Sequence, residues 1–225
     1  MTPRLLPGRP AAIERLLRMT AAAHGQVLNL SRLGQSLGLS HTTVKSHIES
    51  LEGAFLVRRL PPFSANLTKR LVKSPKLYWR DSGLLHALLR VASYEELLVQ
   101  PWVGASWEGF VVEQILATLA ARGVRADAHF LRTSDGHEID LLLDVERERW
   151  AIEVKLTSDP DPRDLDRLER LADLVDAERR VLVSQTRREA VTERRASCDL
   201  PRLLELLPSG PGRRRAPKAR RGARR

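Results

Sequence analysis

The stretch GHEIDLLLDVERERWAIEVK, at residues 136–155, places acidic side chains at regular spacings within two apolar runs. Each run alternates apolar and polar residues with a period of two, which is typical of a half-buried strand. The runs are separated by a few charged residues, so the pattern predicts a β-hairpin. A two-residue turn at 146–147 would set Asp140 directly opposite Glu153, with Lys155 on the same face.

Two carboxylates in that position repel each other. Directly opposed residues have Cβ atoms roughly 5 Å apart, and like charges there destabilise a sheet. A divalent cation that bridges Asp140 and Glu153 would offset the repulsion. Lys155 would offset part of it without any metal. The spacing therefore predicts either a metal site or an internally satisfied charge cluster.

A third carboxylate comes from the helix predicted over SWEGFVVEQILATLAARG, at residues 106–123. Glu108 lies on the apolar stripe of this helix, which consists of Val111, Val112, Ile115 and Leu119. Burying a carboxylate is costly unless it is paired, so Glu108 requires a partner. Glu113 is rotated away from the stripe, and we expect it to be solvated.

The segments around these residues predict one α/β domain over residues 102–208. The helix is followed by a strand near 128–132, the hairpin, a helix near 162–177 and the strand RVLVSQ, which gives the order αβββαβ. A strand, a helical crossover and a further strand imply a right-handed parallel unit. RVLVSQ should therefore lie beside WAIEVKL, and the segment DLPRLLELLP should end the fold as a short helix.

Residues 11–79 predict a winged helix-turn-helix domain, with two short helices joined by a turn and followed by two extended runs. Such domains commonly place the second helix in the DNA major groove. The candidate nucleic-acid-binding residues suit phosphate contacts better than base reading, and they are Thr42, Thr43, Lys45, Arg58, Arg59, Lys69 and Arg70. A packing or protein-interaction role is the alternative. His24, His41 and His47 lack metal-ligand spacing and are expected on the surface.

The remaining segments connect or flank these domains. Residues 80–101 predict a helical connector, and residues 1–10, with three prolines, a disordered lead-in. Residues 209–225 predict a disordered tail with eight basic and no acidic residues. Without the tail the chain has 30 basic and 28 acidic residues, so the folded part is nearly neutral. The tail would attract nucleic acid without sequence preference, or serve only to keep the protein soluble.

Composition excludes several classes of protein. The single cysteine, Cys198, rules out an intramolecular disulfide and a multi-cysteine zinc site. No apolar run approaches the roughly 18 residues that a membrane helix needs, and the N-terminus lacks the pattern of a signal peptide. The expectation is a cytoplasmic protein that does not enter a membrane.

Element order and motif together resemble the PD-(D/E)XK restriction-endonuclease-like fold. The resemblance implies that Glu108 is the helix acid, that Asp140 is the metal-binding aspartate, and that Glu153 and Lys155 form the E-x-K pair. It further implies that Asp140, Glu153 and Glu108 hold Mg²⁺ or Mn²⁺ during phosphodiester hydrolysis. The proline of the motif is absent, as in many members, and Glu138 stands two residues before the aspartate.

A wider resemblance covers residues 11–208. The winged helix followed by KLYWRDSGLLHALL, WEGFVVEQIL, EIDLLLD and AIEVK is similar to the C-terminal half of a prokaryotic AAA-type ATPase family. No G-x-x-x-x-G-K-[ST] motif occurs, so this chain cannot cradle ATP phosphates in the P-loop manner. The chain would be a natural short form, the product of a split gene, or a fragment, and a separate P-loop ATPase would be a partner.

The sequence thus predicts a metal-dependent nuclease acting on nucleic acid, most naturally DNA. Two alternatives stay open: a catalytically weak or inactive accessory module that binds nucleic acid or a partner ATPase, and a winged-helix DNA-binding regulator. The sequence assigns no oligomeric state.

Overall fold

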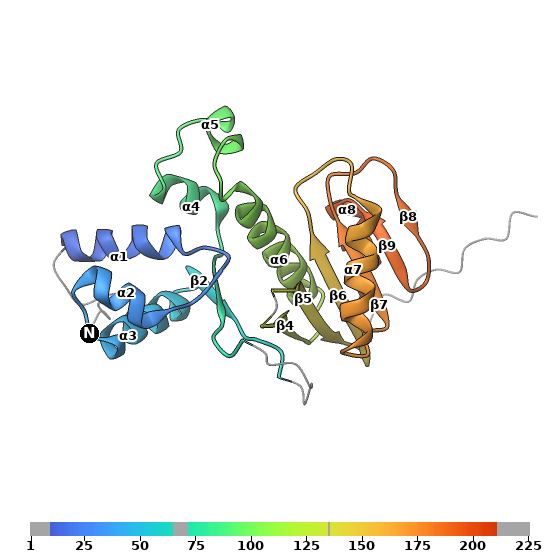
Figure 1. Cartoon of the computed structure of the whole chain (residues 1–225), viewed down its shortest axis with the longest axis horizontal. Coiled ribbons are helices and arrows are strands. Elements are labelled where there is room, and N and C mark those ends of the chain that lie inside the picture. Colours follow the sequence, from blue (N-terminus) through green and yellow to red (C-terminus); the bar gives the residue numbers. More distant parts are fainter. Residues whose placement is uncertain (1–9, 65–71, 135, 211–225) are drawn as a thin grey trace, which may run out of the picture.

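The computed structural model describes residues 10–64, 72–134 and 136–210. Residues 211–225 of the disordered tail predicted from residue 209, residues 1–9 of the predicted lead-in, and the candidate residues Lys69 and Arg70 lie outside the described residues. Residue 10, expected in the lead-in, already belongs to the first helix. The ribbon has an N-terminal group of helices on the left and a sheet flanked by helices on the right (Figure 1).

The N-terminal part has the order α-β-α-α-β-β. It consists of α1 (Pro10–Ala22), β1 (Gln26–Val27), α2 (Leu30–Leu37), α3 (His41–Gly53), β2 (Val57–Leu60) and β3 (Lys76–Trp79). The three strands form an antiparallel sheet in the order β1-β3-β2. Side chains of Asn29 and Ser40 accept main-chain N–H groups and so begin α2 and α3. The core between helices and sheet contains Val44 and Ile48 of α3 and Trp79 of β3.

Two short helices connect this part to the rest of the chain. They are α4 (Ser82–Leu88), which Asp81 caps, and α5 (Tyr94–Leu98), which Ser93 caps. Leu85 of α4 is fully buried, whereas α5 has no buried residue. In Figure 1 α5 projects from the top of the molecule.

The C-terminal part is built on a mixed six-stranded sheet. Its elements are α6 (Val103–Ala121), β4 (Ala126–Arg132), β5 (Glu138–Val145), β6 (Glu148–Val154), α7 (Pro162–Asp173), β7 (Arg179–Val183), β8 (Ala190–Val191), β9 (Arg195–Cys198) and α8 (Leu200–Leu206). The strand order is β4-β5-β6-β7-β9-β8. The predicted mixed α/β architecture is confirmed, and β7 runs parallel to β6 as expected. The short strands β8 and β9 were not predicted.

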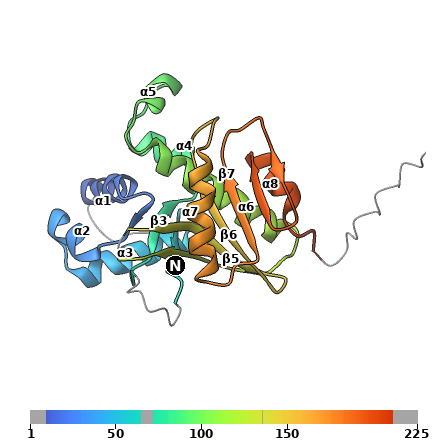
Figure 2. The same ribbon diagram turned by 45° about the vertical axis from the view of Figure 1, so that its right-hand side comes forward.

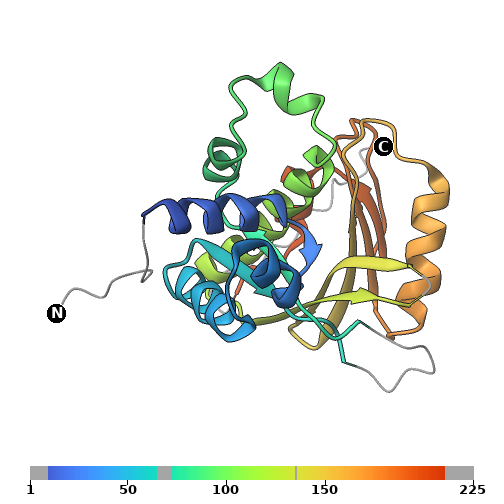
Figure 3. The same ribbon diagram turned by 60° about the vertical axis from the view of Figure 1, so that its left-hand side comes forward.

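Helices cover both faces of this sheet. On one face α6 and α8 pack through Val111, Ile115 and Leu203 against Leu143 and Ile152. On the other face α7 packs through residues such as Leu168 and Leu171. Figures 2 and 3 show α7 alone on its face, with α6 and the N-terminal helices beyond the opposite face. Within the described residues, the longest apolar helices fall short of what crossing a membrane requires.

The hairpin has the register that the sequence predicts. The pairs run from Val145 opposite Glu148 to Leu141 opposite Ile152. Residues 146 and 147 connect the strands with φ angles of 49° and 73°. Two successive positive φ angles define the type I′ turn, whose twist matches that of the flanking strands.

Candidate functional site

A β-bulge in β5 sets the direction of the central aspartate. His129 of β4 pairs with Leu142, but Leu131 pairs with Ile139, so β5 has one extra residue in this interval. The face alternation therefore changes, and Ile139 packs with Leu142 on the α7 face instead of with Leu141. The strict alternation predicted for β5 is wrong at this point. Bulges re-aim side chains, and this one re-aims Asp140.

The carboxylate of Asp140 extends the hydrogen bonding of the hairpin. Main-chain pairing between β5 and β6 ends at Leu141 and Ile152, one pair short of the predicted Asp140–Glu153 pair. Beyond that point Oδ2 of Asp140 accepts the N–H of Val154 at 2.9 Å. The side chain thus supplies the acceptor where the two strands diverge, which fixes its orientation at the end of the hairpin.

Three further carboxylates lie around Asp140, and we call the four together the acid cluster: Glu108, Glu138, Asp140 and Glu153. Oε1 of Glu108 accepts from Lys76 Nζ at 2.7 Å and from the Tyr78 hydroxyl. Oε1 of Glu153 accepts from Lys155 Nζ at 2.6 Å. The structure therefore brings together Glu108, Asp140, Glu153 and Lys155, as the sequence predicted, although they come from three separate elements.

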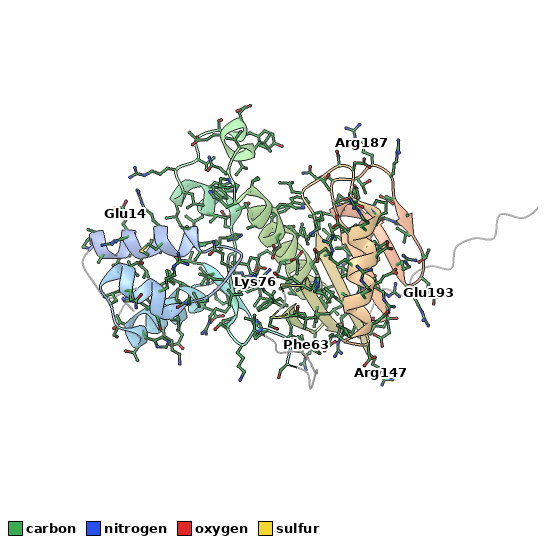
Figure 4. All side chains as sticks on the ribbon, in the orientation of Figure 1. Glu14, Phe63, Lys76, Arg147, Arg187 and Glu193 are labelled. Carbon is green, nitrogen blue, oxygen red and sulfur yellow. The ribbon has the colours of Figure 1, made fainter. Side chains whose placement is uncertain are left out.

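Lys76 is the residue that sequence reasoning missed. It comes from β3 of the N-terminal part, is only 2% exposed, and contacts Glu138 as well as Glu108. Its Nζ lies 3.7 Å from Oδ1 of Asp140. Figure 4 labels Lys76 between the N-terminal helices and α6. The signal in the sequence was a lysine opening the otherwise apolar run KLYW, because a buried lysine requires acidic partners.

Excess negative charge shapes the electrostatics of the cluster. Burial, together with the charges of Glu108 and Glu153, raises the pKa of Asp140 well above its usual range. Burial also raises the pKa of Glu153, although the adjacent Lys155 opposes the shift. Burial lowers the pKa of Lys76, but the surrounding carboxylates outweigh it and leave that pKa above its usual value. Four carboxylates face two ammonium groups, and the guanidinium of Arg132 lies 3.6 Å from Glu138, so the fully ionised cluster carries a formal charge of −1.

One oxygen of the cluster has no partner. Oε2 of Glu153 is buried and receives no hydrogen bond from the described residues. A buried oxygen of this kind, in a cluster of net negative charge, is compatible with a cation ligand. In the arrangement of the described residues, however, no three His, Cys, Asp or Glu side chains form a group that could hold a metal ion. Cation binding would therefore require side-chain movement within the cluster.

Glu113, five residues after Glu108 on α6, is not solvated as predicted. It is 6% exposed and forms ion pairs with Arg58 and Arg80. The Arg80 Nε–Glu113 Oε2 distance is 2.9 Å. The apolar stripe of α6 is therefore wider than its spacing indicated, because the N-terminal part covers a second face of the helix. Arg58, a candidate phosphate ligand, is engaged in this internal pair.

The other candidate nucleic-acid-binding residues make local contacts. The guanidinium of Arg59 pairs with Glu52, with an Nε–Oε2 distance of 2.7 Å. The Thr42 and Thr43 hydroxyls each lie 2.8 Å from the capping Ser40 hydroxyl, and Lys45 is exposed. Thr42, Thr43 and Lys45 share the N-terminal half of α3, whereas both arginines lie on β2 in ion pairs.

Two of the three histidines expected on the surface are buried. His47 lies within the N-terminal core, and His24 links that part to α6. Nδ1 of His24 accepts the Trp79 N–H at 3.0 Å, and its Nε2 lies 3.1 Å from the Ala105 carbonyl oxygen. These contacts assign the proton to Nε2, so His24 is a neutral structural residue. Its burial lowers its pKa from 6.5 to about 4.

Comparisons with known proteins match each part to a domain profile without an assigned function. Residues 4–95 match the profile described as domain of unknown function DUF8612, and residues 103–203 match that of domain of unknown function DUF4143. The second match is consistent with a domain that often follows the ATPase in AAA-ATPase proteins. It agrees with the resemblance seen in the sequence.

Two mycobacterial proteins are similar to the chain. They are the uncharacterized protein Rv2008c of Mycobacterium tuberculosis and the uncharacterized protein Mb2031c of Mycobacterium bovis. Each is 39% identical over 150 residues, which cover 67% of this chain and 33% of the relative. The chain thus aligns with about one third of the length of these relatives. No solved structure matches the chain with significance.

Proposed function

We propose that this protein is a metal-dependent nuclease of the PD-(D/E)XK type, joined to an N-terminal winged helix. The observation that carries the proposal is the convergence of Glu108, Asp140, Glu153 and Lys155 where β5 and β6 diverge. The element orders support the same assignment, since α6 to β7 follow αβββαβ and α1 to β3 follow the order of a winged helix.

Asp140 and Glu153 would hold one or two Mg²⁺ or Mn²⁺ ions, with Glu108 binding directly or through water. Their chemistry suits this task, because hard divalent cations prefer carboxylate oxygens and the ionised cluster has excess negative charge. A bound ion would supply positive charge for the scissile phosphate and lower the pKa of a coordinated water.

Lys155 would act beside these carboxylates. Its ammonium lies 2.6 Å from Oε1 of Glu153, and its side chain is about one-third exposed, so it can reach a phosphate at the surface of the site. It would orient the attacking water or donate a hydrogen bond to a phosphate oxygen in the transition state. Glu153 keeps the ammonium in position for either role.

A second candidate is a catalytically inactive accessory module that docks on nucleic acid or on a P-loop ATPase. The observation that favours it is Lys76, which already pairs with Glu108 and Glu138 inside the cluster. A gene-regulatory role of the winged helix is the weakest of the three, since Arg58 and Arg59 are held in internal ion pairs.

The test is cleavage of plasmid and single-stranded DNA, and of RNA, with Mg²⁺ or Mn²⁺. We expect the wild type to cleave at least one substrate, and Asp140→Asn and Lys155→Ala to lose about 100-fold or more in rate. Asp144→Asn is the matched control, since Asp144 lies on the same strand but pairs with Arg149 at 2.6 Å, away from the cluster. Cleavage that persists in both site variants, or is absent with every substrate, would reject the nuclease proposal and leave the accessory module.

A further inference from the structure

We propose that Lys76 is a built-in counter-cation of the acid cluster, through which the N-terminal part sets the affinity of the site for divalent cations. The inference rests on the proposed metal site but not on cleavage. It assigns to a residue outside the nuclease-like domain a direct role in metal binding.

The first support is how firmly β3 is held. β3 is the central strand of its sheet, and Lys76 is paired with Val27 on one side and Leu60 on the other. Tyr78, two residues on, donates its hydroxyl to the same Oε1 of Glu108 that accepts from Lys76. The strand therefore delivers the ammonium to a fixed point, and only the side chain is free to move.

The second support is which carboxylates the ammonium engages. Nζ contacts Glu108 and Glu138 and lies 3.7 Å from Asp140. Two of these three, Glu108 and Asp140, are ligands in the proposed metal site. An ion bound to them would lie within a few ångströms of the ammonium, in a region that is largely shielded from solvent. Like charges at that range repel strongly in a partly buried site.

The charges of the cluster give the direction of the effect. With Lys76 in place the ionised cluster, including the guanidinium of Arg132 beside Glu138, has a formal charge of −1, and without the Lys76 ammonium the charge becomes −2. Replacing Lys76 with a neutral side chain therefore removes a competing cation and adds to the attraction for a divalent ion. Arginine at this position would keep the positive charge, so it serves as the charge-conserving variant.

The experiment is isothermal titration of the full chain with Mn²⁺. We expect Lys76→Met to bind Mn²⁺ at least about tenfold more tightly than the wild type. Lys76→Arg and the exposed control Lys73→Met should stay within about threefold of it. Thermal unfolding should report the same change, with Mn²⁺ raising the melting temperature of Lys76→Met more than that of the wild type.

Several outcomes would overturn the inference. The first is a folded Lys76→Met protein that binds Mn²⁺ with the same affinity as the wild type. If Lys76→Met is unfolded without metal, refolding on addition of Mn²⁺ supports the inference, and failure to refold overturns it, because the cluster has not accepted the ion in place of the ammonium. Binding by none of the proteins rejects the metal site and this inference together. Tighter binding without cleavage keeps this inference and rejects only the nuclease.

Discussion

Two glutamates on α6, the buried Glu113 and the partly buried Glu108, differ in the charge that surrounds them. Glu113 faces two guanidinium groups, those of Arg58 and Arg80, so that cluster has an excess of positive charge at a partly exposed boundary. Glu108 lies among three other carboxylates with two ammonium groups and the guanidinium of Arg132, so its cluster has an excess of negative charge. Both join α6 to the N-terminal part, five residues apart on the same helix.

The difference separates a structural contact from a candidate site. A buried carboxylate whose role is only to hold two parts of the molecule together needs a cationic partner. Glu113 has two such partners, the guanidinium groups of Arg58 and Arg80. The acid cluster retains unbalanced charge, and burial together with the neighbouring carboxylates raises the pKa values of Asp140 and Glu153. Proteins retain such unfavourable arrangements mainly at functional sites. The two ends of this interface should therefore respond in opposite ways to removal of an acid.

The largest effect on stability should come from Glu113→Ala. The substitution leaves two guanidinium groups without their carboxylate in a partly buried contact, which we expect to cost about 4 kcal/mol of unfolding free energy. Urea denaturation measures it, and Glu49→Ala is the control, since Glu49 forms an exposed pair with Lys45. A loss below about 1 kcal/mol would mean that Glu113 does not fasten the interface.

Acid should weaken the same interface through His24. Its pKa is about 4 in the folded protein against 6.5 ordinarily, chiefly because of burial, so the folded state disfavours the proton. Its contribution is complete above pH 6.5 and is lost as the pH falls toward 4, a change of up to about 3 kcal/mol.

Urea melts between pH 7 and pH 4 test this contribution. His24→Gln should be less stable at pH 7 but should show a smaller fall toward pH 4, and the exposed His41→Gln should follow the wild type. Equal slopes in the wild type and His24→Gln would assign the acid sensitivity to other groups.

Removing an acid from the cluster should stabilise the protein. The raised pKa of Asp140 means that its ionisation opposes folding, so the wild type loses stability as the pH rises above the ordinary aspartate range. Asn keeps an oxygen for the Val154 N–H but carries no charge. Without divalent cations we therefore expect Asp140→Asn to gain about 1 kcal/mol at pH 8.

That gain should grow with pH and should reverse when Mn²⁺ is present, because only the wild type then gains the binding energy of the ion. Melting temperatures at pH 5 to 9, with chelator and with Mn²⁺, measure both effects. If Asp140→Asn is less stable than the wild type in chelator, loss of an acid destabilises both ends of the interface. The contrast between Glu113 and the acid cluster then no longer holds.

The smallest effect should come from Arg59→Ala. Arg59 and Glu52 are about one-third exposed, with side-chain exposures of 30% and 35%, so solvent screens their ion pair. We expect a loss of about 0.5 kcal/mol. The same variant tests nucleic-acid binding: a marked loss of DNA affinity, with a shallower salt dependence, would show that Arg59 leaves Glu52 to contact phosphate.

The sequence by itself determined much of the C-terminal domain. Alternation of apolar residues and a two-residue turn were enough to fix the register of the hairpin, because a period of two leaves one core-facing arrangement. Glu108, Asp140, Glu153 and Lys155 could be selected because each is a charged residue at a position that the pattern marks as structured. The crossover rule likewise placed β7 beside β6.

Only the tertiary structure decided how these residues are used. The bulge that re-aims Asp140 depends on pairing with β4, a contact between strands that local spacing does not encode. Lys76 and Glu113 became buried because the N-terminal part covers α6, more than 20 residues away in sequence. Packing between segments distant in sequence determined which charged partners each of these side chains has. Those partners distinguish the structural contact at Glu113 from the candidate metal site at Glu108.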